Sequence, residues 1–395
     1  MKLSIKKVWF LFLPVLIILF FPLKSILGEI SILDVFIFIV FISSMFSFKI
    51  YKIHFYLFII IIFSLISSFV NFNKIENIKY WVRLVEYICV FYITYFYYDE
   101  ETHVYFNKGI LIILISLIFY GIIQKIFPQL INIGNWGPEW KENYIIFNKV
   151  RVYSFLDNPL NLVGVLSLFL GYYISNNNRN KFILIVLIYI VLFLTGSKIA
   201  IAIILLSITY FIFNIIIKNS INKVYFFVLI LTVGIMLLNY KRIKETTVYK
   251  RYVNKVERYD SVNQRELVLN SSIEMIKDNP IFGIGAGNFG EIYPFYKKKR
   301  ASNEESSFTS ENMFVDFYLD NGLIPFIIFI YIIIEVFLSY FVYKKEKVLK
   351  RLIRAIFFFI LVGFVTNLRS VPTFMLFFYF IAIFYKRKNI LNARI

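Results

Sequence analysis

The sequence predicts an all-α, polytopic integral membrane protein with about twelve transmembrane helices and one large extracytoplasmic loop. Hydrophobic residues make up 59% of the 395 residues, and the mean hydropathy is +0.73, whereas soluble domains are close to half apolar. The apolar residues form repeated runs near the ~20 residues that a helix needs to cross a bilayer. Barrel strands are shorter and alternate in polarity, so helices are favoured.

The predicted spans begin close to the N-terminus. The first apolar run lacks a small-residue cleavage site and is followed at once by another, so we interpret it as a retained helix. The spans cover roughly residues 8–27, 30–48, 53–70, 78–97, 109–127, 159–175, 182–195, 199–217, 224–239, 313–342, 355–368 and 372–385. The chain thus divides into residues 1–239 with spans one to nine, a large loop at 240–312, and residues 313–395 with the last three spans.

Lysine and arginine in the short loops predict the orientation. Basic residues flank alternate ends of the spans, and positive charge in short loops marks the cytoplasmic side. Both termini are therefore expected in the cytoplasm, and the loops at 128–158 and 240–312 outside it. The basic residues that carry this prediction are Lys2, Lys6, Lys7, Lys49, Lys52, Arg179, Lys181, Lys218, Lys223, Lys344, Lys345, Lys347, Lys350, Arg351, Arg354, Lys386, Arg387 and Lys388.

The net charge of +19 does not indicate nucleic-acid binding, because most of the charge lies in these loops. Cys89 is the only cysteine, so an intramolecular disulfide and a cysteine metal site are excluded. His54 and His103 lie in separate regions, and the sequence contains no Asp-x-Asp motif. A bound catalytic metal and a cofactor are therefore not expected.

Residues 263–322 form the most informative polar segment. Arg265 opens a stretch in which Leu269, Ile273 and Ile276 recur at helical spacing, which predicts an apolar helix face. Asn279-Pro280 is expected to end that helix, because proline moves the preceding residue out of the helical region.

Glycines at positions 283, 285 and 287 then predict a compact turn rather than a nucleotide site, since neither a strand nor a Gly-Lys-Ser/Thr motif accompanies them. A basic tetrad follows, made of Lys297, Lys298, Lys299 and Arg300. A basic, glycine-turned segment between membrane spans indicates a site for an anionic, lipid-linked substrate. The alternative for the tetrad is contact with lipid headgroups.

Arg265 and Arg151 are candidate phosphate ligands, because the guanidinium fork matches phosphate oxygens and stays charged. Both lie in loops expected on the outer face, where they would hold a pyrophosphate together. The structural alternative is an interfacial arginine that reaches lipid headgroups. Lys198, in a tight outer turn, is a further candidate phosphate cation or a plain interfacial anchor.

A second group begins at Glu311. Asn312, Asp316 and Asp320 follow at a spacing of four, which places them on one helix face. Glu311 would stand at the outer end and accept a proton from a sugar hydroxyl. The alternative is a helix cap with ordinary interfacial acids.

A third group, Lys79, Arg83 and Glu86, shares one face of the fourth span. Ionisable groups within spans indicate function, so Arg83 is a candidate substrate ligand. A structural Arg83–Glu86 pair inside the bundle is the alternative.

Three patches of this sequence resemble the O-antigen ligase/polymerase superfamily of bacterial inner-membrane proteins. The first two run from Arg151 to Asn158-Pro159, and from Arg265 through Asn279-Pro280 to Gly287-Asn288-Phe289. The third runs from Asn312 to Asp320-Asn321-Gly322-Leu323-Ile324. Two departures are visible. Glu311 stands where the ligase branch usually has histidine, and Lys198 replaces the arginine of a Ser-Arg turn. The missing histidine favours the polymerase branch, which varies more at this position.

The resemblance implies glycosyl transfer between two undecaprenyl-pyrophosphate-linked oligosaccharides on the outer face of the inner membrane, without metal or nucleotide. Arg265 and Arg151 would stabilise the departing pyrophosphate, and Glu311 would orient or deprotonate the acceptor hydroxyl. Asn312, Lys198, Arg83 and the basic tetrad would contact substrate. Membrane lipid, a chain-length regulator and a flippase are the other candidate partners. The competing interpretations are a ligase that joins glycan to lipid A core or protein, and a transporter of lipid-linked oligosaccharide.

Overall fold

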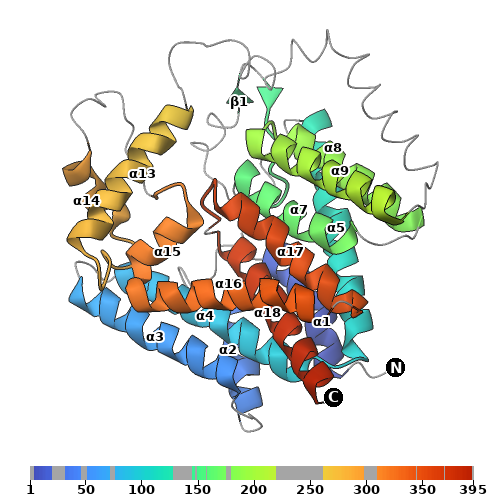
Figure 1. Ribbon diagram of the computed structural model, residues 1–395, viewed down its shortest axis with the longest axis horizontal. Coiled ribbons are helices and arrows are strands. Elements are labelled where there is room, and N and C mark those ends of the chain that lie inside the picture. The colour runs from blue at the N-terminus through green and yellow to red at the C-terminus, as the bar shows by residue number, and fades with distance from the viewer. Residues whose placement is uncertain are drawn as a thin grey trace.

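The computed structural model describes residues 4–19, 32–45, 51–71, 76–127, 145–146, 149–156, 158–174, 179–218, 261–297, 309–343, 345–368 and 370–393. These residues are almost wholly helical (Figure 1). The first helices are α1 (Ile5–Leu19), α2 (Ile32–Met45), α3 (Lys52–Val70), α4 (Glu76–Tyr97) and α5 (Thr102–Ile126). A two-residue antiparallel ladder of β1 (Ile145–Ile146) and β2 (Lys149–Val150) follows.

The second half of the chain continues the helical arrangement. It contains α7 (Pro159–Tyr173), α8 (Arg179–Leu194), α9 (Lys198–Lys218), α13 (Ser261–Asp278) and α14 (Phe289–Tyr296). The last helices are α15 (Met313–Asn321), α16 (Leu323–Val342), α17 (Lys347–Gly363) and α18 (Val371–Asn392).

Helices α7 and α18 form the interior of the bundle. Almost every side chain of α7 and of the first two-thirds of α18 is buried, as expected for helices that are apolar on all sides. Helix α7 packs along α17, and α18 packs along α4. Gly171 permits the first of these contacts, because a Cβ there would lie 2.5 Å from the carbonyl oxygen of Arg354.

The outer helices expose large apolar side chains. Phe55 on α3, Phe119 on α5 and Phe341 on α16 are each more than half exposed, which suits contact with lipid tails rather than water. Among the described helices, α3, α5 and α16 are long and apolar enough to cross a membrane by length and composition. Shorter apolar helices, including α7, accompany them. These features are those of an integral membrane protein.

The predicted span at 313–342 is wrong as a single helix. Gly322, with a φ of +84°, separates α15 from α16. A Cβ there would lie 2.5 Å from the carbonyl oxygen of Ile281, so the break is built into the local packing. The other predicted spans overlap with helices, except for 224–239, which lies outside the described residues. The number of membrane crossings stays a prediction.

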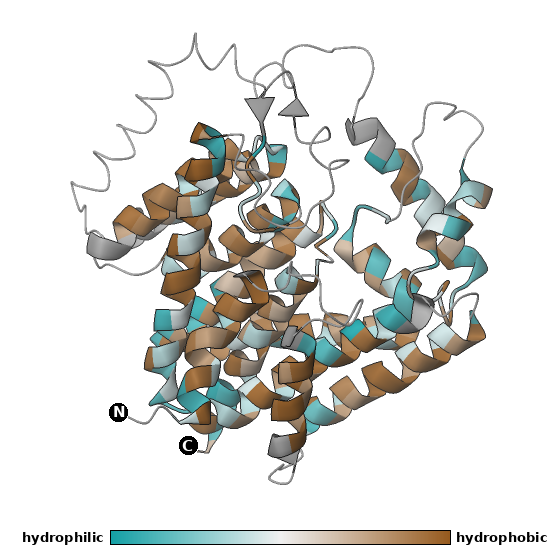
Figure 2. Ribbon diagram, turned by 180° about the vertical axis from the view of Figure 1, so that it is seen from behind, coloured by the Kyte–Doolittle hydropathy of each residue, from teal (hydrophilic) through white to brown (hydrophobic). Residues whose placement is uncertain are grey.

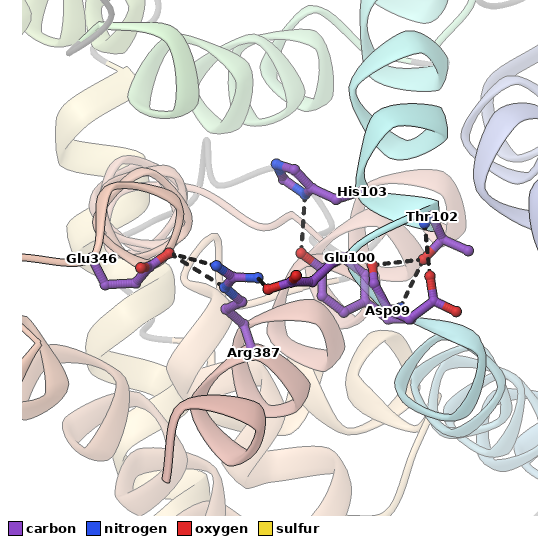
Figure 3. Close-up of polar contacts among 7 residues, drawn as sticks. Asp99, Glu100, Thr102, His103, Glu346 and Arg387 are labelled. Carbon is purple, nitrogen blue, oxygen red and sulfur yellow. Dashed lines mark hydrogen bonds and ion pairs between the residues drawn. The ribbon is translucent and has the colours of Figure 1, made fainter. Parts of the chain in front are cut away.

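The two chain ends lie at the same end of the molecule in both overall views (Figures 1 and 2). Charged side chains join the elements there. Arg387 on α18 forms ion pairs of 3.1 Å with Glu346 before α17 and with Glu100 before α5 (Figure 3). Lys7 on α1 pairs with Glu101. The β1–β2 ladder and α13 lie away from this end (Figure 1).

Candidate active site

The glycine-turned segment after α13 packs against the junction of α15 and α16. The N–H of Ile284 donates to the Leu319 carbonyl at 2.8 Å, and the N–H of Leu323 donates to the Ile281 carbonyl at 2.9 Å. Gly283 has a φ of +66°, and a Cβ there would lie 2.4 Å from the Leu319 carbonyl oxygen. Glycine is therefore required by conformation and by space. The predicted compact turn is confirmed.

The end of α3 holds the same junction from another side. Ser67 Oγ donates to the carbonyls of Phe282 and Asp320, the second at 3.1 Å. Asn288 Nδ2 donates to the Asn71 carbonyl at 2.9 Å. Ser67 and Asn288 are both buried, so these bonds satisfy polar groups that water does not reach. Three segments distant in sequence thus form one support for α15.

Helix α13 ends at Asp278, directly before Asn279-Pro280, as predicted. Its predicted apolar face is wrong at Ile273, which is 40% exposed. The buried face instead contains Val268, Met275 and the small Ser271. Ser271 Oγ donates to the Tyr296 carbonyl at 3.1 Å, which lets α14 approach closely. Hydrogen-bonding serines therefore take positions that the hydrophobic pattern had assigned to solvent.

Arg265 and Glu311, both predicted as catalytic, lie together. Arg265 Nη2 is 3.6 Å from Glu311 Oε2, across the contact between α13 and α15. The two side chains are 34% and 36% exposed, so a ligand can reach either of them. Ion pairs that water partly reaches contribute only modestly to stability, so a ligand can compete for either side chain. The site presents a guanidinium and a carboxylate side by side.

The backbone at Glu311 is unusual, because its φ is +60°, a region that non-glycine residues rarely adopt. The next residue, Asn312, caps α15. Its Oδ1 accepts the N–H groups of Phe314 at 2.9 Å and Val315 at 3.2 Å. Its Nδ2 donates to the Phe364 carbonyl at 2.8 Å. The helix cap, which was the structural alternative for Glu311 and the residues after it, is thus present at Asn312. The cap fixes the backbone directly after Glu311.

The surroundings of Glu311 change its acidity. Burial raises the pKa of this carboxyl above its ordinary value, the Arg265 charge opposes the rise, and the nearby Asp316 adds to it. Asp316 is buried, and its Oδ1 accepts the N–H of Ser310 at 2.7 Å. A carboxylate with a raised pKa is a stronger base, which is what proton abstraction from a hydroxyl requires.

Arg151 and Lys198 gather at a different turn. Arg151 Nε donates to the Thr195 carbonyl at 2.9 Å, and the N–H of Val152 donates to the Leu194 carbonyl at 3.3 Å. Lys198 opens α9 three residues after Thr195 and is exposed. The structure therefore brings these two predicted phosphate cations to one turn between α8 and α9.

The supports of the two arginines differ. Arg265 stands on α13, which packs on α14 and α15, whereas Arg151 follows β2 and binds the α8–α9 turn. Both α13 and the ladder lie away from the chain ends (Figure 1). The meeting of the two guanidinium groups over one diphosphate stays a prediction.

A cavity of about 420 Å³ lies beside α15. The predicted Arg83–Glu86 pair is confirmed in its wall, at 2.7 Å from Nη1 to Oε2. The same Nη1 lies 2.8 Å from Asp34 Oδ1. The sequence analysis did not identify Asp34 as a partner of Arg83. Its position as an acid inside an apolar run was the signal that could have revealed it. The cavity is lined by Lys79, Tyr80, Arg83, Leu84, Tyr87, Ala286, Met313, Phe317, Asp320, Asn321, Val371 and Phe374.

The basic tetrad is described only at its first residue. The N–H of Lys297 donates to the Tyr293 carbonyl at 3.1 Å and closes α14. Lys298, Lys299 and Arg300 lie outside the described residues, so their predicted contact with substrate stays a prediction.

Residues 183–330 match the family model described as O-antigen ligase. The matched stretch runs from α8 into α16 and contains Lys198, Arg265, Glu311 and Asn312. It begins after Arg83 and Arg151. No curated protein matches the sequence.

Proposed function

We propose that this chain, a member of the O-antigen ligase/polymerase superfamily, is a surface-polysaccharide polymerase. It would transfer a growing glycan from its undecaprenyl-pyrophosphate carrier to a lipid-linked repeat unit, on the outer face of the bacterial cytoplasmic membrane. The Arg265–Glu311 pair carries this proposal. It brings a guanidinium and a carboxylate together at one partly exposed site, which supports the proposed roles of phosphate ligand and proton acceptor.

In the proposed reaction, the bond between the anomeric carbon of the donor sugar and the pyrophosphate oxygen breaks. The acceptor hydroxyl oxygen forms the new bond to that carbon, and its proton passes to the Glu311 carboxylate. The electron pair of the broken bond stays on the pyrophosphate. Arg265, with Arg151 in support, stabilises that charge through bidentate hydrogen bonds.

The observed ion pair suggests how the two roles are coupled. Arg265 lowers the pKa of Glu311 in the absence of substrate. When a pyrophosphate engages the guanidinium, its charge is shared with the phosphate oxygens. The proton affinity of Glu311 then rises, so donor binding would prepare the base for the acceptor. Asn312 keeps the carboxylate in place through its cap.

Substitution of Arg265 tests the proposal. Arg265→Ala should abolish chain extension in a complemented deletion strain, and Arg265→Lys should extend chains poorly because a point charge does not replace the fork. The readouts are the polymer ladder on a gel and the protein level in membranes. Lys277→Ala, at an exposed position of the same helix, is the matched control. Long chains in the Arg265 variants at normal protein levels would remove Arg265 from the site.

A ligase is the second candidate, because the matched family model is described as O-antigen ligase. The deletion strain separates the two. Loss of the ladder with one capped repeat unit remaining supports a polymerase, whereas complete loss of attached glycan supports a ligase. Accumulation of lipid-linked units on the cytoplasmic leaflet would instead indicate the transporter.

A flippase and a chain-length regulator are the proposed partners of a polymerase.

A further inference from the structure

We propose that the cavity beside α15 binds an uncharged sugar ring of the acceptor unit. This inference rests on the proposed glycosyl transfer and adds a sugar subsite to it. The cavity volume of about 420 Å³ falls within the roughly 300–1,000 Å³ of small-molecule sites.

The cavity and the catalytic pair share one helix. Met313 and Phe317 line the cavity one turn apart on α15, and Glu311 lies two residues before Met313. Ala286, from the glycine-turned segment, completes this wall. A ring seated here would lie along the helix whose N-terminal end carries the proposed base.

The lining has the chemistry of a sugar site. The aromatic side chains of Tyr80, Tyr87 and Phe317 line the cavity and provide apolar contact for the C–H groups of a pyranose ring. Asp320 and Asn321, at the C-terminal end of α15, offer a carboxylate and an amide to its hydroxyls. Asn321 Nδ2 donates to the Phe317 carbonyl at 2.9 Å, which fixes the amide. Apolar walls with a few fixed polar groups are typical of ligand sites.

The charges argue against a phosphate in this cavity. Arg83 binds the carboxylates of both Asp34 and Glu86, so its charge is already compensated. Among the described residues of the lining, Asp320 adds a third carboxylate and Lys79 a second cation. These described groups therefore offer a pyrophosphate no excess of positive charge, whereas Arg265, paired with one carboxylate, presents a partly exposed guanidinium. The charge balance therefore favours phosphate binding at Arg265 and binding of the uncharged sugar ring in the cavity.

The test measures binding of two probes to the purified full chain in nanodiscs. The sugar probe is the repeat-unit oligosaccharide that mild acid releases from the lipid carrier of a deletion strain. The phosphate probe is farnesyl pyrophosphate, which carries no sugar. Asp320→Asn should weaken the sugar probe about tenfold, the effect of a lost hydrogen bond to a charged group. Tyr80→Ala should also weaken it, and Tyr80 is 53% exposed, so its loss spares the core.

The controls separate the two subsites. Glu266→Gln makes the same charge change at an exposed position of α13 and should bind both probes as wild type does. Arg265→Ala should no longer bind farnesyl pyrophosphate but should bind the sugar probe with wild-type affinity. Wild-type sugar affinity in both cavity variants would overturn the proposal, as would cavity variants that lose farnesyl pyrophosphate instead.

A turnover assay assigns the ring to acceptor or donor. The released oligosaccharide should be extended by lipid-linked units, with a KM that rises in the cavity variants. A probe that binds the cavity but is never extended would overturn the acceptor assignment. The binding test does not depend on turnover. An active Arg265→Ala variant would therefore contradict the proposed function, whereas the sugar-binding measurements would still show whether the cavity holds a sugar ring.

Discussion

Glu311 combines features that rarely occur in one residue. It adopts a left-handed backbone conformation, faces an arginine at 3.6 Å and lies near a buried second carboxylate. Strained conformations at exposed polar residues often accompany function. A carboxylate with a raised pKa can supply the proton acceptance that the resemblance assigns to histidine in the ligase branch.

The acidity of Glu311 predicts a pH dependence. In the proposed reaction the Glu311 carboxyl must be ionised to accept a proton, so the rate of chain extension should fall as the pH drops through its pKa. Because that pKa is raised, the acid limb should lie above the range of an ordinary glutamate. Asp316→Asn removes a like charge, so the limb should move to lower pH. Initial rates measured against pH check this.

Glu311→Gln is the control for that experiment and should be nearly inactive at every pH. Asparagine at position 316 retains an oxygen for the N–H of Ser310, so the local fold is kept. An acid limb that stays in place in Asp316→Asn would show that another group governs the profile.

At the scale of elements, the contact between the glycine-turned segment and the α15–α16 junction positions the site. Backbone hydrogen bonds cross it in both directions, and the end of α3 closes it through Ser67 and Asn71. Helix α15 is only nine residues long, too short to be stable alone. Its orientation therefore depends on these neighbours.

Gly283→Ala should destabilise the protein by about 1–3 kcal/mol, because alanine at positive φ is strained and the added Cβ would meet the Leu319 carbonyl. Thermal unfolding of the purified protein in detergent measures the loss. Gly290→Ala is the matched control, since position 290 lies inside α14, where alanine is the better helix former. Equal melting temperatures for Gly283→Ala and wild type would contradict the proposed requirement for glycine.

Part of the structure around α13, the Gly283 turn and the α15–α16 junction could be predicted from the sequence. The other part could not, because it depends on contacts between distant residues. Proline and glycine act locally, so the end of α13 and the turn at Gly283 followed from the sequence. The buried face of α13 did not, because Ser271 finds its partner on α14. The break at Gly322 did not follow from the predicted single span, although Asp320-Asn321-Gly322 interrupts the apolar residues there. The Ile281 carbonyl, which leaves no room for a Cβ at Gly322, is remote in sequence.

The site itself was predictable in its residues but less so in its contacts. Arg265 stood out as the arginine that opens a predicted helix in the large loop, and Glu311 as an acid at the outer end of a predicted span. The meeting of the two side chains depends on the fold. Asp34 and the cavity polar groups required helices distant in sequence to meet, which no local pattern encodes.

On the scale of the whole molecule, the chain ends are tied to the turns between helices. Arg387 is only 13% exposed and joins Glu346 to Glu100 (Figure 3). Asp99 and Thr102 form reciprocal hydrogen bonds of 2.8 Å at the start of α5, which order the turn that carries Glu100. Helices α5, α17 and α18 are therefore connected at one end of the bundle.

Arg387→Gln should lower the unfolding free energy by about 1.5–3 kcal/mol, the range for hydrogen bonds to charged groups. Half of the Glu100 side chain is exposed, so water will reduce the contribution of the Arg387–Glu100 pair to this free energy. The measurement is thermal unfolding in detergent. Lys6→Gln is the matched control, because Lys6 and Asp99 are both exposed and 3.8 Å apart, and it should change the melting temperature little. A wild-type melting temperature in Arg387→Gln would show that this connection is not needed.

The hydrogen bonds of Ser67 also bear on biosynthesis. Its acceptors lie 215 and 253 residues further along the chain, so this serine leaves the ribosome long before they exist. Until then, the Ser67 hydroxyl must bond to water or to a nearer group of the chain. A nascent chain that stops short of Asp320 leaves this bond unmade. The support that Ser67 gives to α15 is therefore completed only after Asp320 has been synthesised.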